Sequence, residues 1–96
     1  DFVARLGGDE FVVLAGNLAQ SNSASTVADK LIAAVAQPFA LEGGREVLVT
    51  LSIGISLGPQ DSADAAELLH RADAAMYLAK QRGKNRYVQY ADAFES

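Results

Sequence analysis

Short runs of apolar residues, and one run in which bulky and small residues alternate, predict β-strands. Asp1–Leu6 has the character of the end of an extended segment, and Phe11–Ala15 is a second short strand rich in β-branched and apolar residues. The run Glu46–Leu57 alternates bulky with small residues. Because strand neighbours face opposite sides of a sheet, this run predicts one face on a core and another element packed closely on the other. Arg86–Tyr90 predicts a last short strand.

Two segments have helical spacing of their apolar residues. The first begins at about Ser25 or Thr26 and ends at Gln37, before a proline. The second runs from about Asp64 to Arg82, and a glycine follows it as a stop signal. The tail, Ala91–Ser96, is expected to be frayed.

The order strand, strand, helix, strand, helix, strand predicts an α/β sandwich, with helices packed on a mostly antiparallel sheet. The length, 96 residues, fits one domain. However, the chain opens in mid-strand, and the predicted sheet has few strands for its helices. We therefore expect residues 1–96 to be one partial domain.

Composition narrows the possible partners and compartment. The chain has no cysteine, which excludes disulfides and thiolate metal sites and fits a reducing, cytoplasmic location. No apolar run approaches the roughly 20 residues of a membrane helix, so no membrane contact is expected. A net charge of −4 argues against nucleic acid as a partner. The few cations of the last third could still hold a small anionic ligand.

The turn Gly7-Gly8-Asp9-Glu10 is the first candidate site. Glycine leaves backbone N–H groups unshielded, so a phosphate could approach, and the carboxylates supply hard oxygen ligands suited to Mg²⁺. The same residue types are also common in solvated hairpin turns. The spacing alone leaves both interpretations open.

Cations near the end of the second helix form the other candidate site. Lys80 and Lys84 flank the helix terminus, where they could hold the outer phosphates of a nucleotide. Alternatively, they simply complement the helix dipole. His70 has no evident Asp or Ser partner and is expected to be a surface residue.

Four segments together resemble a known family. Arg5–Phe11 resembles the signature of the GGDEF family, the bacterial diguanylate cyclases, and Thr50–Ser56 resembles the family's central strand. Arg71–Lys80 and Gly83–Arg86 resemble its last helix and the turn that follows. The resemblance implies a ferredoxin-like, nucleotide-cyclase-like sandwich.

The family's activity would be the condensation of two GTP molecules to cyclic di-GMP in bacterial signal transduction, a nucleotidyltransferase reaction that needs Mg²⁺ or Mn²⁺. The resemblance makes Asp9 a catalytic, metal-binding acid, and Glu10 a support for the metal or for the attacking 3′-hydroxyl. It places Gly7 and Gly8 against the α- and β-phosphates. Lys80 and Lys84 would hold the terminal phosphates.

The chain also departs from the family pattern. The family's first strand, with another metal-binding Asp, and its guanine-reading segment are not present. We therefore expect the parent protein to be a diguanylate cyclase, and these 96 residues alone to be inactive. Asp1 has the spacing of an inhibitory product-binding residue, but the partner Arg of that site would precede it.

The missing strand leaves two expectations for the sheet. Exposed strand edges invite a homodimer or a swapped oligomer. Alternatively, Phe11–Ala15 closes directly onto Thr50–Ser56.

Two other functions remain open at this point. The chain could be a regulatory GGDEF module that binds GTP or cyclic di-GMP and controls an attached phosphodiesterase or other domain. It could also be an inert folding fragment.

Overall fold

The structure, a computed structural model, describes residues 2–16, 21–36, 39–40, 42–47, 49–59 and 61–94. Its elements, in chain order, are β1 Phe2–Arg5, β2 Glu10–Ala15, α1 Ser21–Val35, β3 Phe39–Ala40, the 3₁₀ turn η2 Glu42–Gly44, β4 Glu46–Val47, β5 Ser52–Leu57, α2 Ala65–Gln81, β6 Arg86–Gln89 and α3 Tyr90–Phe94. The expected α/β class is confirmed, and α1 begins one turn earlier than the sequence suggested.

The main sheet has four strands in the order β1-β2-β5-β6. The β1–β2 hairpin is antiparallel, whereas β2–β5 and β5–β6 are parallel. The prediction of a mostly antiparallel sheet is therefore wrong. The reason is topological, because α1 lies between β2 and β5 and α2 lies between β5 and β6. A helix between two strands brings the chain back to the end where the first strand began, so the strands run parallel.

No strand separates β2 from β5. Their paired positions run from Glu10 opposite Ser52 to Ala15 opposite Leu57. Of the two arrangements expected for the sheet, the structure has direct closure. As a result, the acidic turn that precedes β2 lies at the same end of the sheet as the start of β5.

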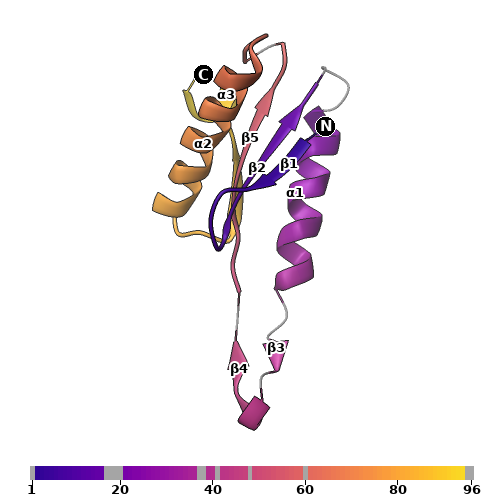
Figure 1. The fold of residues 1–96 in the computed structure, drawn as a ribbon, viewed down its shortest axis with the longest axis vertical. Coiled ribbons are helices and arrows are strands. Elements are labelled where there is room, and N and C mark those ends of the chain that lie inside the picture. The colour runs from indigo at the N-terminus through magenta and orange to yellow at the C-terminus, as the bar shows by residue number, and fades with distance from the viewer. Residues whose placement is uncertain are drawn as a thin grey trace.

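The two faces of β5 pack against different helices, and all six of its residues are buried. Ile53 and Ile55 belong to a cluster that includes the α1 residue Ala28. On the other face, a Cβ at Gly54 would overlap the backbone oxygen of Ala72 in α2. Figure 1 shows α1 and α2 on opposite sides of the sheet. The expectation of a bulky face and a closely packed face is confirmed.

The predicted long strand Glu46–Leu57 is divided in the structure. Its first part, β4, pairs with β3 in a small antiparallel sheet at one end of the molecule (Figure 1). Its last part, β5, joins the main sheet only from Ser52, the partner of Glu10. The prediction of a single strand is wrong. Because β2 begins at Glu10, the partner of Ser52, the segment before Ser52 has no residue of β2 to pair with.

The ends of α2 are close to those expected. Asp64 caps the helix by accepting hydrogen bonds from the N–H groups of Ala66 and Glu67, at 2.8 and 3.3 Å. The expectation of a frayed tail is wrong for residues 91–94, which form most of α3. This short helix is supported by ring stacking between Tyr90 and Phe94, with centroids 4.8 Å apart.

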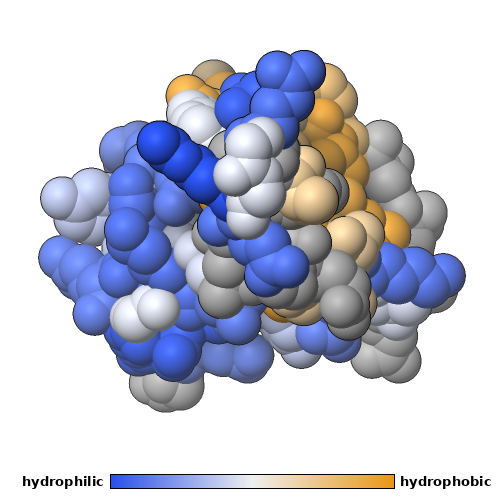
Figure 2. Space-filling view, turned by 90° about the horizontal axis from the view of Figure 1, so that it is seen from below, coloured by the Kyte–Doolittle hydropathy of each residue, from blue (hydrophilic) through white to orange (hydrophobic). Residues whose placement is uncertain are grey.

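Polarity is uneven over the surface. Figure 2, which views the molecule from the end bearing β3 and β4, shows hydrophilic residues over one side and hydrophobic residues gathered on the other. Within the described ranges, no helix is both long enough and apolar enough to cross a membrane.

Candidate functional site

The β1–β2 turn is held by backbone bonds and by one arginine. The Leu6 N–H donates to the Glu10 carbonyl at 2.7 Å. Arg5 Nε lies 2.9 Å from the Gly7 carbonyl oxygen and 3.1 Å from that of Gly8. This bracing role was missed at the sequence level. The available signal was an arginine two residues before the first glycine of the turn, since a guanidinium can reach carbonyls two and three residues ahead.

The two glycines of the turn have different environments. A Cβ at Gly7 would overlap Glu10 Oε1, so the carboxylate rests on the glycine backbone. The Gly7 N–H also donates to the Glu10 carbonyl, with a donor–acceptor distance of 3.4 Å. No atom lies within 4 Å of the Cβ position at Gly8. Of the two glycines predicted to be open to a phosphate, Gly8 is the one with open space at its Cβ position.

Glu10 and Lys80 meet although they are far apart in the sequence. Lys80 Nζ donates to Glu10 Oε2 at 2.5 Å. The side chains of Lys80 and Glu10 are 29% and 25% exposed, so the pair is accessible from solvent without being fully hydrated. The structure therefore joins a carboxylate of the first candidate site to an ammonium of the second.

The contact with Glu10 raises the pKa of Lys80. The pKa of Lys80 lies above its ordinary value of 10.5, chiefly because its ammonium donates the hydrogen bond to Glu10. Partial burial acts in the opposite direction, and the negative charges of Glu10 and Asp9 add to the rise. Asp9 is thus close enough to contribute to the same field. Its carbonyl accepts a hydrogen bond from the Ser52 N–H at 2.9 Å, which ties the turn to β5.

Lys84 occupies a tight turn after α2. The Lys84 N–H donates to the Ala79 carbonyl at 3.0 Å, and the Gly83 N–H donates to the Lys80 carbonyl at 3.3 Å. These bonds form a Schellman motif, in which glycine at positive φ ends the helix. Lys84 itself has φ of 61°. Its side chain is exposed and forms no hydrogen bond or ion pair with any residue the structure describes. The structure thus brings Lys80, but not Lys84, into contact with a carboxylate of the acidic turn, that of Glu10.

The family model described as "Diguanylate cyclase, GGDEF domain" matches residues 1–86. The chain belongs to the GGDEF family. This match covers both the acidic turn and Lys80, the two parts of the site that the fold brings together. Asp1, the remaining predicted residue, lies outside the described residues.

Relatives within the GGDEF family are similar over nearly the whole chain. The diguanylate cyclase TpbB of Pseudomonas aeruginosa strain UCBPP-PA14 is 47% identical over 94 residues, which is 96% of this chain and 22% of TpbB. The bifunctional diguanylate cyclase/cyclic di-GMP phosphodiesterase MucR of P. aeruginosa strain PAO1 is 46% identical over 96 residues, which is 100% of this chain and 14% of MucR. This chain therefore spans less than a quarter of either relative.

A solved GGDEF domain has the same fold. The crystal structure of the GGDEF domain of TpbB from P. aeruginosa superposes with a TM-score of 0.75 at 40% identity. The superposition covers 91% of this chain and 54% of that domain.

The GGDEF family typically uses Mg²⁺, and the acidic turn offers a partial set of ligands for it. Within the described part of the chain there is no cluster of three or more His, Cys, Asp or Glu residues arranged to hold a metal ion. Mg²⁺, however, is commonly bound through one or two carboxylates together with substrate phosphates. The Glu10 carboxylate already presents Oε2 to a cation, the Lys80 ammonium. The residues present therefore fit an ion that arrives with a phosphate.

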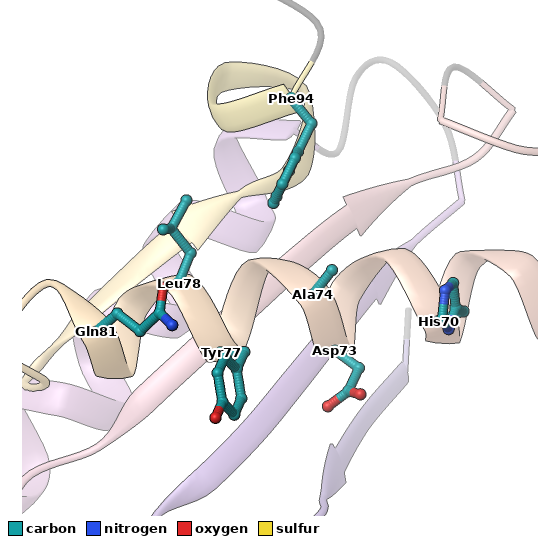
Figure 3. A pocket seen from close by; sticks show the side chains of 7 residues that line it. All are labelled: His70, Asp73, Ala74, Tyr77, Leu78, Gln81 and Phe94. Atoms are coloured by element: carbon teal, nitrogen blue, oxygen red, sulfur yellow. The ribbon is translucent and has the colours of Figure 1, made fainter.

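A shallow groove lies along α2, next to α3 (Figure 3). It encloses about 410 Å³ and carries none of the predicted site residues. His70, expected at the surface, is exposed and lines this groove. The lining residues are His70, Asp73, Ala74, Tyr77, Leu78, Gln81 and Phe94.

Proposed function

We propose that this chain is part of a catalytic GGDEF domain that condenses two GTP molecules to cyclic di-GMP. The observation that carries the proposal is the contact between Lys80 Nζ and Glu10 Oε2 at 2.5 Å. It brings together the Lys80 ammonium, a group that can bind a phosphate, and the Glu10 carboxylate, a group that can bind a metal ion. A triphosphate carrying a divalent ion needs both types within a few ångströms of each other.

Each residue of the candidate site has a role in this proposal. When bound, a divalent ion neutralises phosphate charge and acidifies the attacking 3′-hydroxyl. Asp9 and Glu10 supply the carboxylates for that ion. The open backbone at Gly8, with Gly7 beside it, faces the inner phosphates. Lys80 and Lys84 hold the outer phosphates.

Two GTP molecules and one site per chain imply two facing copies. We therefore propose a homodimer as the working form, with each copy holding one nucleotide. The chain aligns with 54% of the solved TpbB domain, and we propose that residues 1–96 are a partial GGDEF domain. The role of Asp1 in product inhibition stays a prediction.

The experiment uses the protein as the cell makes it, incubated with GTP and Mg²⁺, with cyclic di-GMP measured by mass spectrometry. Glu10→Gln is expected to lower product formation by about 100-fold or more, because an anionic metal ligand is lost. Lys80→Met is expected to weaken GTP binding by about 10- to 100-fold. Lys30→Met, on the exposed side of α1, is the matched control and should leave both values unchanged. Product formation that is insensitive to Glu10→Gln would contradict the assignment.

A second function is favoured by one comparison. MucR, which is 46% identical to this chain, is named as both a cyclase and a cyclic di-GMP phosphodiesterase. A regulatory GGDEF module that binds GTP or cyclic di-GMP and controls a neighbouring phosphodiesterase domain is therefore the alternative. It predicts GTP binding with no product, and a change in phosphodiesterase rate on adding GTP.

A further inference from the structure

The turn between α2 and β6 has a conformation that one of its residues does not favour. Gly83, Lys84 and Asn85 all have positive φ, at 112°, 61° and 52°. Glycine adopts such angles freely and asparagine adopts them more readily than most residues, whereas lysine has no such preference. A glycine in place of Lys84 would form the same turn with less backbone strain. The presence of a lysine here therefore calls for an explanation other than the shape of the turn.

The side chain of Arg86 closes this turn. Its Nε donates to the Lys84 carbonyl at 3.0 Å. Its guanidinium also covers Gly83, because a Cβ built on Gly83 would lie 3.2 Å from Arg86 Nη2. The backbone of Arg86 is fixed at the sheet, where its N–H donates to the Leu51 carbonyl at 3.1 Å. Arg86 thus links the start of β6 to the carbonyl of Lys84.

The turn also connects the two lysines of the candidate site. The Gly83 N–H donates to the Lys80 carbonyl at 3.3 Å, and the Lys84 N–H donates to the Ala79 carbonyl at 3.0 Å. Lys84 is therefore attached to the last turn of α2, which carries Lys80. None of these contacts, nor those of Arg86, involves β2. The conformation of the turn is therefore independent of which strand lies beside β5 on the side away from β6.

We propose that Arg86 is a positioning residue for Lys84. By holding the Lys84 carbonyl, Arg86 keeps the backbone of Lys84 in its left-handed conformation and so fixes the direction in which the side chain leaves the turn. A lysine side chain loses conformational freedom when its ammonium binds a phosphate, and a backbone that is already fixed reduces this loss. This inference rests on the proposed function, since it requires Lys84 to hold an outer phosphate of GTP.

Two other roles for Arg86 make different predictions. Arg86 is exposed, so its guanidinium could bind a phosphate directly. In that case the positive charge of Arg86 matters, and its hydrogen bond to Lys84 does not. Alternatively, Arg86 only stabilises the turn, and its loss would weaken binding whether or not Lys84 is present. The positioning role requires the donor at Nε rather than the charge, and it has an effect only while Lys84 is present.

The test uses the protein as the cell makes it. The probe is the Mg²⁺ complex of a GTP analogue with a methylene between the α- and β-phosphates, and its binding is measured by titration calorimetry. Arg86→Met should weaken binding about three- to tenfold. Arg86→Gln places an uncharged N–H donor at the same number of bonds from the backbone as Arg86 Nε. It should bind the analogue within about twofold of wild type.

Arg82→Met is the matched control for the loss of one positive charge near the turn. Arg82 is exposed, and its side chain forms no hydrogen bond or ion pair with any residue that the structure describes. This variant should bind the analogue as wild type does. In a Lys84→Met background, Arg86→Met should have no further effect on binding. The melting temperature of Arg86→Met should stay close to that of wild type, because the hydrogen bond that it removes is exposed to solvent.

Several outcomes would overturn the role of Arg86 and leave the proposed function standing. One is normal binding by Arg86→Met together with weak binding by Lys84→Met. Equal weakening in Arg86→Met and Arg86→Gln, or in Arg86→Met and Arg82→Met, would show that charge is what matters. An effect of Arg86→Met that persists in the Lys84→Met background, or an Arg86→Met variant that fails to fold, would show a role other than positioning Lys84.

Other outcomes concern the proposed function itself. Normal binding by Lys84→Met would overturn both the phosphate-binding role of Lys84 and the positioning role of Arg86. The assignment of Glu10 would then still be decided by product formation in Glu10→Gln. No binding of the analogue by the wild type would overturn both proposals.

Discussion

Lys80 Nζ and Glu10 Oε2 lie 2.5 Å apart, although the two residues are 70 positions apart in the sequence. In the proposed function these side chains bind different parts of one ligand, a metal ion and a phosphate. Here they bind each other instead. Binding of a metal–nucleotide complex would therefore be an exchange of partners. Lys80 would leave Glu10 for a phosphate, and Glu10 would bind the metal ion, so that neither charge is left unpaired.

The first prediction concerns the pH dependence of this ion pair. Because the pKa of Lys80 in the folded protein is above 10.5, the pair stabilises the fold in full below pH 10.5. That contribution is lost as the pH rises through the folded-state pKa. The difference in melting temperature between wild type and Lys80→Met should be small, since the pair is partly exposed, and constant from about pH 7 to 10. It should then shrink in more alkaline solution.

The Lys30→Met variant controls for the loss of one positive charge from the surface. Its difference from wild type should not follow the same alkaline course. If the difference in melting temperature between wild type and Lys80→Met already disappears near neutral pH, that difference does not measure the ion pair.

A second prediction concerns the space above Gly7. In Gly7→Ala, the new methyl group occupies the place of Glu10 Oε1 and displaces the end of a flexible side chain. The domain should stay folded, but the contact with Lys80 should be lost. The pKa of Lys80 should then fall back toward 10.5, as measured by NMR titration of its Nζ. Gly8→Ala, with open space around its Cβ, should leave the titration of Lys80 as in wild type.

Gly54→Ala should be among the most damaging single changes in the chain. Its methyl group would overlap the Ala72 carbonyl oxygen and the Met76 backbone nitrogen, and helix backbone cannot move aside as a side chain does. We expect a loss of about 3 kcal/mol or more in the free energy of unfolding, measured by urea denaturation. Gly8→Ala should cost far less. A urea midpoint for Gly54→Ala close to that of the wild type would mean that α2 does not pack directly against this glycine.

The cap of α2 gives a fourth prediction. Asp64→Ala removes the acceptor for the N–H groups of Ala66 and Glu67 and should cost about 1 kcal/mol. For a domain of this size, that corresponds to a melting temperature lower by about 4–8 °C. Asp64→Asn keeps an acceptor oxygen and should retain most of the stability. Equal losses in both variants would point to the charge rather than to the hydrogen bonds.

Local signals in the sequence were enough to predict several parts of the fold. The glycine turn predicted the hairpin, and Asp64 and Gly83 marked the two ends of α2. Alternation in the second half of Glu46–Leu57 predicted both faces of β5 correctly. These features depend on the preferences of a few adjacent residues, which the sequence displays directly.

Features that depend on distant partners were predicted less well. The parallel order follows from which strands become neighbours, and β4 is separate because β3 pairs with it. Glu67 shows the same limit, because it follows Asp64 by three residues, which is the spacing of a capping box. In the structure its carboxylate instead pairs with Arg71 at 3.0 Å.

In the candidate site, too, the residues could be predicted from the sequence, whereas their arrangement in space could not. The sequence and its family resemblance identified Asp9, Glu10 and Lys80 as candidates, but not their mutual distances. Nothing local indicated that the Glu10 carboxylate rests on Gly7, or that it contacts Lys80. The first contact is made within the β1–β2 turn, and the second depends on how α2 packs against the sheet.

The absence of a side chain at Gly54 has an effect beyond its own contact. It fixes how far α2 can slide along β5, because Ala72 and Met76 rest directly on it. Lys80 follows Met76 by one turn, about 6 Å along the helix axis. The distance between the Lys80 ammonium and the acidic turn therefore depends on packing in the middle of the sheet. In the proposed function, a substitution at Gly54 would change how the chain binds its nucleotide, although Gly54 itself is none of the proposed binding residues.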